Sequence, residues 1–398
     1  MAPTPVFPRN PRPNLVPIGP LDRPRMSTER PQSEAAAPIR SPLQDFSLAD
    51  LEAMRLLLTG GSVIDWHRLA FRNEPEVARF LRVNEFNPDS NEDLNRLEEL
   101  RDEAVDYLGR TFAYHIPAEV STGIPVQDLF LLASQKGRRQ TYACVLLKAM
   151  HVIHHLAGRE LLFQLPISDN QVFGYIEKKV LKVVEEMRGA GFPIVEFAWS
   201  RKERDSLITK LLAKRHSIAA NVYDKLRFRL ITRSREDLAP MLVELCHRLV
   251  PFNYIIPGES VNAIIDFRRL VDTAPLDRLA PELQADLHAA AAPPLPDNEF
   301  SGPAYRVINF VADLPVRLDD YLLELDQSPT DELGSTIFVL TEFQIMDADT
   351  AATNELGENS HAAYKERQVA RVKARLAGGS RATRERAAHS AAAEEEEE

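Results

Sequence analysis

The chain has 398 residues, of which 44% are hydrophobic and 27% charged, and its formal net charge is −11 at pH 7. This hydrophobic share is typical of a globular protein with a substantial core. The negative net charge argues against a protein that coats nucleic acid non-specifically, although the terminal run EEEEE supplies nearly half of this charge. No apolar run reaches the roughly 20 residues that a membrane helix needs, and the N-terminus lacks the apolar segment of a signal peptide. We therefore expect a cytoplasmic protein without a membrane segment.

The two ends of the chain are predicted to stay outside any packed core. Residues 1–42 carry eleven prolines with scattered arginines, a composition typical of a disordered or polyproline-like leader. Residues 367–398 are rich in Ala, Arg and Glu, and we expect a charged disordered tail there. The basic stretch KERQVARVKARL, which overlaps the start of this tail, has a composition that can extend a helix.

Residues 43–190 are predicted to be helical. SLADLEAMRLLL opens with a serine cap and has helical spacing of its apolar residues. NEDLNRLEELRDEAVDYLGRTF is amphipathic and acidic at its start, as the helix dipole favours. TYACVLLKAMHVIHHLAGRELLF is apolar enough for a buried helix, and NQVFGYIEKKVLKVVEEMRGAG ends at Gly191, a suitable C-cap.

Residues 191–366 alternate between strand-like and helix-like stretches. FPIVEFAW, DKLRFRLITRS, YRVINFVADL and STIFVLTEFQI are predicted strands, and RKERDSLITKLLAKR and REDLAPMLVELCHRLV are predicted helices. In DKLRFRL the apolar side chains alternate with Lys225, Arg227 and Arg229, so the cations share one face. The pattern favours a sheet packed with helices, in the α/β or α+β class. Of these we predict α+β, with a mixed sheet flanked by helices.

Cysteine and histidine residues offer little sign of a metal site. Cys144 and Cys246 each stand in an apolar helical context and are expected to be buried thiols. His151, His154 and His155 fall within one predicted helix, where the i, i+3 spacing is compatible with a metal. No carboxylate or cysteine ligand that would complete such a site is near in sequence, so we expect these histidines to be hydrogen-bonded or exposed.

A second candidate feature is the density of cations around RKERDSLITKLLAKR and the strand that follows. The common meaning of such a run is a solvated helix face. A polyphosphate site is the alternative, because it needs several cations together with a metal-binding carboxylate. Asp224 at the start of the strand is such a carboxylate, although an acid at a strand edge is more often a cap or turn residue.

The stretch TEFQI places two polar side chains on one face of a predicted strand. Glu342 and Gln344 are two residues apart and therefore point the same way. A polar pair on an otherwise apolar strand is costly to bury without partners. We therefore expect this face to line a cleft.

These stretches together resemble the synthetase domain of the RelA/SpoT family, which transfers pyrophosphate from ATP to a nucleotide 3′-hydroxyl. The family pattern E-x-Q-I-R-T, E-x-G and H-x-x-Y-K is matched in register by Glu342, Gln344, Ile345, Glu355, Gly357, His361, Tyr364 and Lys365. The D-x-x-G-x-R-I-I strand is matched by Asp224 and Arg229, and the K-x-x-x-S-x-x-x-K-M helix by Lys202, Ser206 and Lys210. The guanine-stacking pattern Y-x-S-x-H is matched only by Tyr305. The resemblance covers roughly residues 195–366 and implies a nucleotidyltransferase-like domain over 191–366.

The resemblance implies a role for most of the matched residues. Asp224 would hold Mg²⁺, and Glu342 would take the proton from the acceptor 3′-hydroxyl. ATP and the acceptor nucleotide would be bound by nine further matched residues, namely Lys202, Ser206, Lys210, Arg229, Tyr305, Gln344, His361, Tyr364 and Lys365. Of these, Lys202, Lys210 and Arg229 would contact ATP phosphates, and Tyr305 would stack on the acceptor base.

Several positions depart from the family pattern. Arg227 replaces the glycine of D-x-x-G, and Met346 replaces the arginine of Q-I-R-T. Val307 and Asn309 replace the serine and histidine after Tyr305. These departures bear on guanine specificity more than on the fold.

Three functions follow as hypotheses. The first is a Mg²⁺-dependent pyrophosphokinase acting on GDP, GTP or another acceptor such as an RNA end. The second is a catalytically silent domain of the same fold that binds a nucleotide or a partner. The third is a nucleotidyltransferase-like fold that binds RNA, against which the acidic terminus argues. The sequence leaves open the acceptor, the role of residues 43–190, and whether the chain forms a homo-oligomer.

Overall fold

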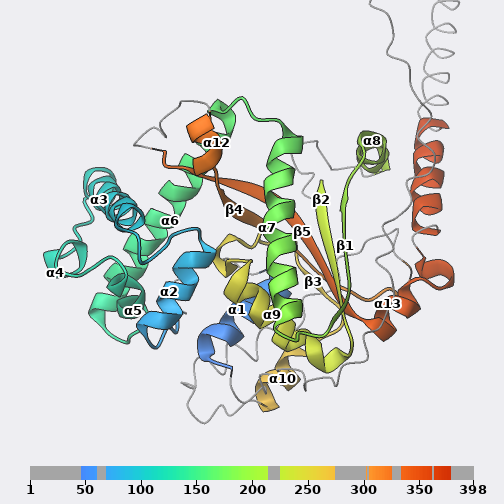
Figure 1. Cartoon of the computed structure of the whole chain (residues 1–398), viewed down its shortest axis with the longest axis horizontal. Coiled ribbons are helices and arrows are strands. Elements are labelled where there is room, and N and C mark those ends of the chain that lie inside the picture. The colour runs from blue at the N-terminus through green and yellow to red at the C-terminus, as the bar shows by residue number, and fades with distance from the viewer. Residues whose placement is uncertain are drawn as a thin grey trace, which may run out of the picture. The chain divides into compact units, whose positions relative to one another are not determined.

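The computed structural model describes residues 46–60, 69–213, 225–273, 302, 304–324, 333–360 and 363–377 (Figure 1). The predicted leader 1–42, Asp224, His361 and the tail beyond residue 377 lie outside these ranges.

Seven helices precede the sheet within the described ranges, as the sequence predicts for residues 43–190. They are α1 (Leu48–Thr59), α2 (Glu74–Val83), α3 (Asn91–Phe112), α4 (Ala118–Ser121), α5 (Asp128–Ala133), α6 (Arg138–Gln164) and α7 (Asp169–Gly189). Ser47 forms a capping box with Asp50 at the start of α1, which satisfies backbone N–H groups of the first turn. Among all helices in the described ranges, none has the length and apolar character needed to cross a membrane.

A five-stranded mixed sheet follows, in the order β1-β2-β5-β4-β3. The strands are β1 (Ile194–Arg201), β2 (Leu226–Thr232), β3 (Val261–Asn262), β4 (Ile308–Arg317) and β5 (Thr336–Asp347). β2 and β5 are parallel and the other neighbours antiparallel. Helices α8 (Arg204–Ala213), α9 (Leu238–Arg248), α10 (Phe267–Thr273), α12 (Asp319–Glu324) and α13 (Ala348–Asn354) lie between or after the strands, and residues 363–377 form a further helix. The predicted α+β class with a mixed sheet is confirmed.

The two faces of the sheet differ because successive side chains of a strand point to opposite sides. On one face a row of phenylalanines crosses β1, β2, β5 and β4. The ring centroids of Phe197 and Phe228 are 6.0 Å apart, those of Phe228 and Phe343 5.7 Å, and those of Phe343 and Phe310 5.2 Å. This face belongs to a core that includes side chains of α1, α7 and α9, and α7 runs across the sheet in Figure 1. The opposite face carries the charged side chains of β2 and β5.

A second core joins α2, α3, α5 and α6. Its aromatic centre contains Phe71, Phe80 and Phe130, with Phe80 also against Phe252. Cys144 is buried in this core as a free thiol. Cys246 on α9 is also a free thiol, and burial raises the pKa of its thiol well above the usual value. Both cysteines therefore act as small apolar side chains.

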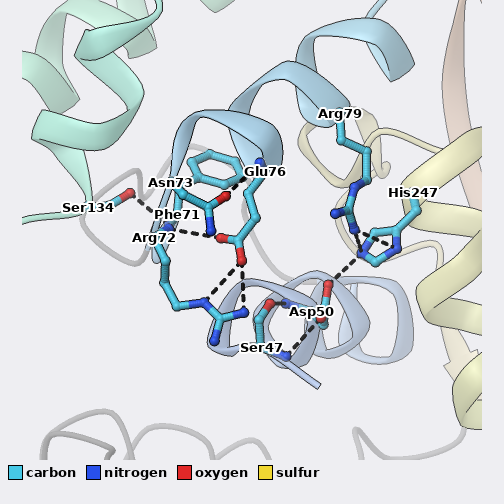
Figure 2. Close-up of polar contacts among 9 residues, drawn as sticks. All are labelled: Ser47, Asp50, Phe71, Arg72, Asn73, Glu76, Arg79, Ser134 and His247. Carbon is cyan, nitrogen blue, oxygen red and sulfur yellow. Dashed lines mark hydrogen bonds and ion pairs between the residues drawn. The ribbon is translucent and has the colours of Figure 1, made fainter. Parts of the chain in front are cut away.

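A polar junction ties α1, α2 and α9 together (Figure 2). Nε2 of His247 lies 2.6 Å from Oδ1 of Asp50, and Nη1 of Arg79 lies 3.0 Å from Nδ1 of the same ring. The His247 ring therefore lies between the Asp50 carboxylate and the Arg79 guanidinium and links α1 and α2 to α9. Burial raises the pKa of Asp50, but hydrogen bonds from His247 and Ser47 outweigh this and the net effect is a lowered pKa.

Gly158 is where α6 meets the sheet most closely. A Cβ at this position would lie 2.5 Å from the Phe338 ring and 2.5 Å from the Thr336 carbonyl oxygen, whereas a Cβ at Gly174 on α7 would meet nothing within 4 Å. We expect Gly158→Ala to lower the free energy of unfolding by about 1–3 kcal/mol, because overpacking outweighs the better helix propensity. Gly174→Ala is the matched control and should raise it by about 0.5–1 kcal/mol. Urea unfolding followed by circular dichroism measures both, and equal stability of the two variants would contradict the close contact.

Candidate functional site: the polar face of β2 and β5

Glu342 is held by two neighbours on the polar face of the sheet. The parallel register places Arg227 opposite Glu342 and Arg229 opposite Gln344. Arg227 Nε donates to Oε2 of Glu342 at 2.8 Å, and Gln344 Nε2 donates to Oε1 at 3.2 Å. The Glu342 side chain is only 8% exposed and that of Arg227 30%. A buried carboxylate is costly without a partner, and Arg227 is the ion-pair partner of Glu342.

Arg229 extends the polar face toward the end of β5. Its Nη1 donates to Oε1 of Glu355 at 3.4 Å, and its Nη2 lies 3.8 Å from the Met346 sulfur. Its Nε is buried and makes no hydrogen bond within the described residues. A buried N–H without an acceptor is costly. The Nε–H group of Arg229 is therefore suited to donate a hydrogen bond to an anionic oxygen.

Tyr305 completes the cluster from the segment before β4. Burial raises the pKa of Tyr305, and this outweighs the nearby Arg227 and Arg229, which lower it. The phenol therefore remains neutral beside two cations. Asn309 lies opposite Gln344 in the β4–β5 register, and its Oδ1 is buried without a hydrogen-bond partner among the described residues.

The structure brings some of the predicted site residues together. Glu342, Gln344, Arg229 and Tyr305 form the cluster above. Lys202 follows β1, where its backbone N–H donates to the Lys225 carbonyl at 2.8 Å, next to the start of β2. Ser206 and Lys210 are partly buried on α8. Tyr364 and Lys365 lie on helix 363–377, where Gln368 donates to the Tyr364 hydroxyl at 3.0 Å.

Arg227 is the residue whose role the sequence did not indicate. In the family pattern D-x-x-G, Arg227 is only a replacement of the glycine. The alternation of β2 places it on the face of Arg229, but its partner comes from β5, 115 residues later. Glu355 was matched to the family pattern without a role, and it is the ion-pair partner of Arg229.

His151 and His155 of α6 are hydrogen-bonded as expected, and His154 is the exception. His155 Nε2 bonds to Oδ2 of the buried Asp313 at 2.8 Å. His154 is buried, and neither of its ring nitrogens has a hydrogen-bond partner in the described structure. Its ring packs against Phe86 and Phe338, with centroid distances of 5.0 and 5.3 Å, so it serves as an aromatic core residue. No group of three metal-ligating side chains occurs in the part of the chain that the structure describes.

The described part of the polar face does not by itself fit Mg²⁺. Oxygen ligands from carboxylates suit this ion, but the carboxylates of Glu342 and Glu355 each accept hydrogen bonds from an arginine. Mg²⁺ binding would therefore depend on Asp224, which lies outside the described residues, and on substrate phosphates.

The ion pair between Arg227 and Glu342 has a measurable consequence. In a double-mutant cycle of Arg227→Gln and Glu342→Gln, we expect a coupling free energy of about 1–3 kcal/mol toward stability, because the carboxylate is buried. The exposed pair Arg82–Asp89, with side chains 53% and 77% exposed, is the control. That pair should couple by at most about 0.5 kcal/mol. Similar small couplings for both pairs would show that Arg227 does not stabilise Glu342.

No protein-family model matches the chain, and no curated protein does. Among solved structures, the small alarmone synthetase 1 from Bacillus subtilis is similar at 16% identity and a TM-score of 0.29, covering 55% of this chain and 94% of that one. The same protein bound to its product pppGpp is similar at 13% identity and a TM-score of 0.26, covering 59% of this chain and 95% of that one. A GTP pyrophosphokinase family protein from Streptococcus pneumoniae is similar at 13% identity and a TM-score of 0.25, covering 51% of this chain and 81% of that one. Likenesses this low do not extend to function, so the site is interpreted from its own geometry.

Proposed function

We propose that the chain is a nucleotide pyrophosphokinase, which transfers pyrophosphate from ATP to the 3′-hydroxyl of an acceptor nucleotide in a Mg²⁺-dependent reaction. The observation that carries this proposal is the polar face itself. A buried carboxylate and two arginines meet there on adjacent parallel strands, beside a neutral tyrosine from the segment before β4. Phosphoryl-type transfer requires mainly positioning and charge neutralisation, with a base near the attacking oxygen.

In the proposed reaction, the acceptor 3′-oxygen attacks the β-phosphorus of ATP. The bond between that phosphorus and the oxygen bridging to the α-phosphate breaks, and AMP leaves. The hydroxyl proton passes to Glu342. Arg227 and Gln344 each donate one hydrogen bond to the Glu342 carboxylate, so they would orient it while its remaining lone pairs accept the proton.

The remaining residues would bind the two nucleotides. Arg229 would donate its unpartnered Nε–H to a phosphate oxygen, and Tyr305 would offer its ring to the acceptor base. Lys202, Ser206 and Lys210 would contact ATP phosphates. His361, Tyr364 and Lys365 would complete the nucleotide site. Mg²⁺, held by Asp224 and the phosphates, would supply charge neutralisation.

The test is release of AMP from radiolabelled ATP with Mg²⁺ and a panel of acceptors: GDP, GTP, ATP and RNA. Label that moves to one acceptor, and is lost in Asp224→Ala, would support the proposal and name the acceptor. Absence of turnover with every acceptor, despite measurable ATP binding, would replace it with a domain that binds nucleotide without chemistry.

A further inference from the structure

A cavity lies within the second core, where α2, α3, α5 and α6 meet the segment Phe252–Tyr254. Its volume is about 50 Å³, and apolar side chains such as Leu97, Leu100, Phe130 and Leu147 form most of its lining. Close-packed interiors leave few voids larger than one water molecule. Because a buried water needs about 10–15 Å³, this cavity has room for about three or four non-hydrogen atoms.

Two polar side chains of the lining have buried atoms without a partner. Nδ1 and Nε2 of His154 make no hydrogen bond within the described residues, and neither does Oδ1 of Asn253. The Asn253 amide is held in place from its other side, since its Nδ2 donates to Oδ1 of Asn84 at 2.8 Å. A neutral imidazole offers one donor and one acceptor, and an amide oxygen accepts. A ligand group that both donates and accepts, such as a hydroxyl, matches these three atoms.

The lining also requires a ligand without charge. Among the described residues, no Asp, Glu, Lys or Arg lines the cavity. His151 and His154 do line it, and both stay neutral because burial lowers the pKa of each imidazole to about 3. An ion placed among these groups would have no counter-charge and would be costly to bury.

Water alone suits this cavity poorly. Each buried water makes about three hydrogen bonds, and the two polar side chains offer only three unpartnered atoms to three or four waters. The remaining neighbours are mostly leucine and phenylalanine side chains, and cavities with such a lining stay dry and take apolar molecules. A molecule with one hydroxyl group and a short hydrocarbon part matches both kinds of lining.

We propose that this cavity binds a small neutral molecule that carries a hydroxyl group and has the size of a two- or three-carbon alcohol. The hydroxyl group accepts from the N–H of His154 and donates to Asn253, and the hydrocarbon part packs against the leucine side chains of α3 and α6. The proposal is independent of the pyrophosphokinase reaction, because it uses no residue of the polar face.

Binding of propan-1-ol to the full chain at pH 7.5, measured by ligand-detected NMR, tests this proposal. Its four non-hydrogen atoms limit the dissociation constant to about 40 µM at best, and we expect about 0.1–10 mM. The comparison ligand is 1-chloropropane, which has the same length and no hydroxyl group. It should bind at least about tenfold more weakly, because His154 and Asn253 then stay unpaired. A purely apolar cavity would prefer 1-chloropropane, so that preference, or no binding of propan-1-ol up to about 100 mM, would overturn the proposal.

Two variants locate the ligand in the cavity. His154→Phe removes both ring nitrogens, so it should weaken binding of propan-1-ol by about tenfold and leave that of 1-chloropropane unchanged. Leu147→Phe adds a ring to the lining and should abolish binding of both ligands. His115→Gln, at an exposed position, is the control and should bind both like the wild type. Thermal unfolding checks that each variant is folded, and His154→Phe alone decides if Leu147→Phe is not. Wild-type affinity for propan-1-ol in either folded cavity variant would overturn the proposal.

Discussion

Glu342→Gln is expected to lower the rate of pyrophosphate transfer by about 10²–10⁴-fold, the usual contribution of a positioned general base. The amide keeps the shape of the side chain and can still contact Arg227, but it cannot accept the hydroxyl proton. Binding of ATP and acceptor should change little, because the cations that meet the phosphates remain. Single-turnover transfer of labelled pyrophosphate and equilibrium binding of both nucleotides separate the two effects.

Glu355→Gln is the matched control for this prediction. Glu355 also pairs with an arginine on the same face, but its side chain is 58% exposed and stands beyond the end of β5. Its loss should alter the transfer rate by no more than a few-fold. Equal losses in the two variants would mean that negative charge in the cluster matters rather than a base at Glu342. A wild-type rate in Glu342→Gln would remove Glu342 from the chemistry.

The sequence predicts the elements of this fold better than their pairing. Alternation in DKLRFRL gives the two faces of β2, because a strand has a period of two residues. The phenylalanine row and the polar row both follow from that period. The register of β2 against β5 does not, since a parallel pair joined by a long connection carries no local turn signal. The ion pair of Arg227 with Glu342 depends on that register and therefore appears only in the structure.

For the candidate site too, the sequence predicts which side chains share a face but not their partners from distant strands. The matched motif predicts that Glu342 and Gln344 share a face, and they do. The motif treats Arg227 as a departure, although it is the main partner of the Glu342 carboxylate. For the histidines of α6, helical spacing places His151, His154 and His155 near one another. The helix alone does not reveal Asp313, which lies 158 residues from its partner His155, or the aromatic rings around His154.

The buried histidines of α6 should make the fold sensitive to acid. Burial lowers the pKa of His151 and of His154 from 6.5 to about 3, with His155 adding to the effect on both and Arg96 on His154. In the unfolded chain both imidazoles regain a pKa near 6.5 and bind protons that the folded chain excludes. Stability should therefore be unaffected by these groups above pH 6.5 and fall as the pH decreases from 6.5 toward 3. The slope should reach about 1.4 kcal/mol per pH unit for each histidine.

His154→Phe isolates one of these contributions. The new ring fits the aromatic contacts with Phe86 and Phe338 and has no group that titrates, so the acid slope should decrease by about 1.4 kcal/mol per pH unit. Carboxylates that also titrate in this range, such as Asp50, are present in both proteins and cancel in the difference. His115→Gln, at an exposed position, should leave the slope of the wild type unchanged. Urea unfolding across this pH range measures all three proteins. Equal slopes for His154→Phe and the wild type would show that His154 is protonated in the folded chain, because only a histidine that stays neutral while buried withholds a proton that the unfolded chain accepts.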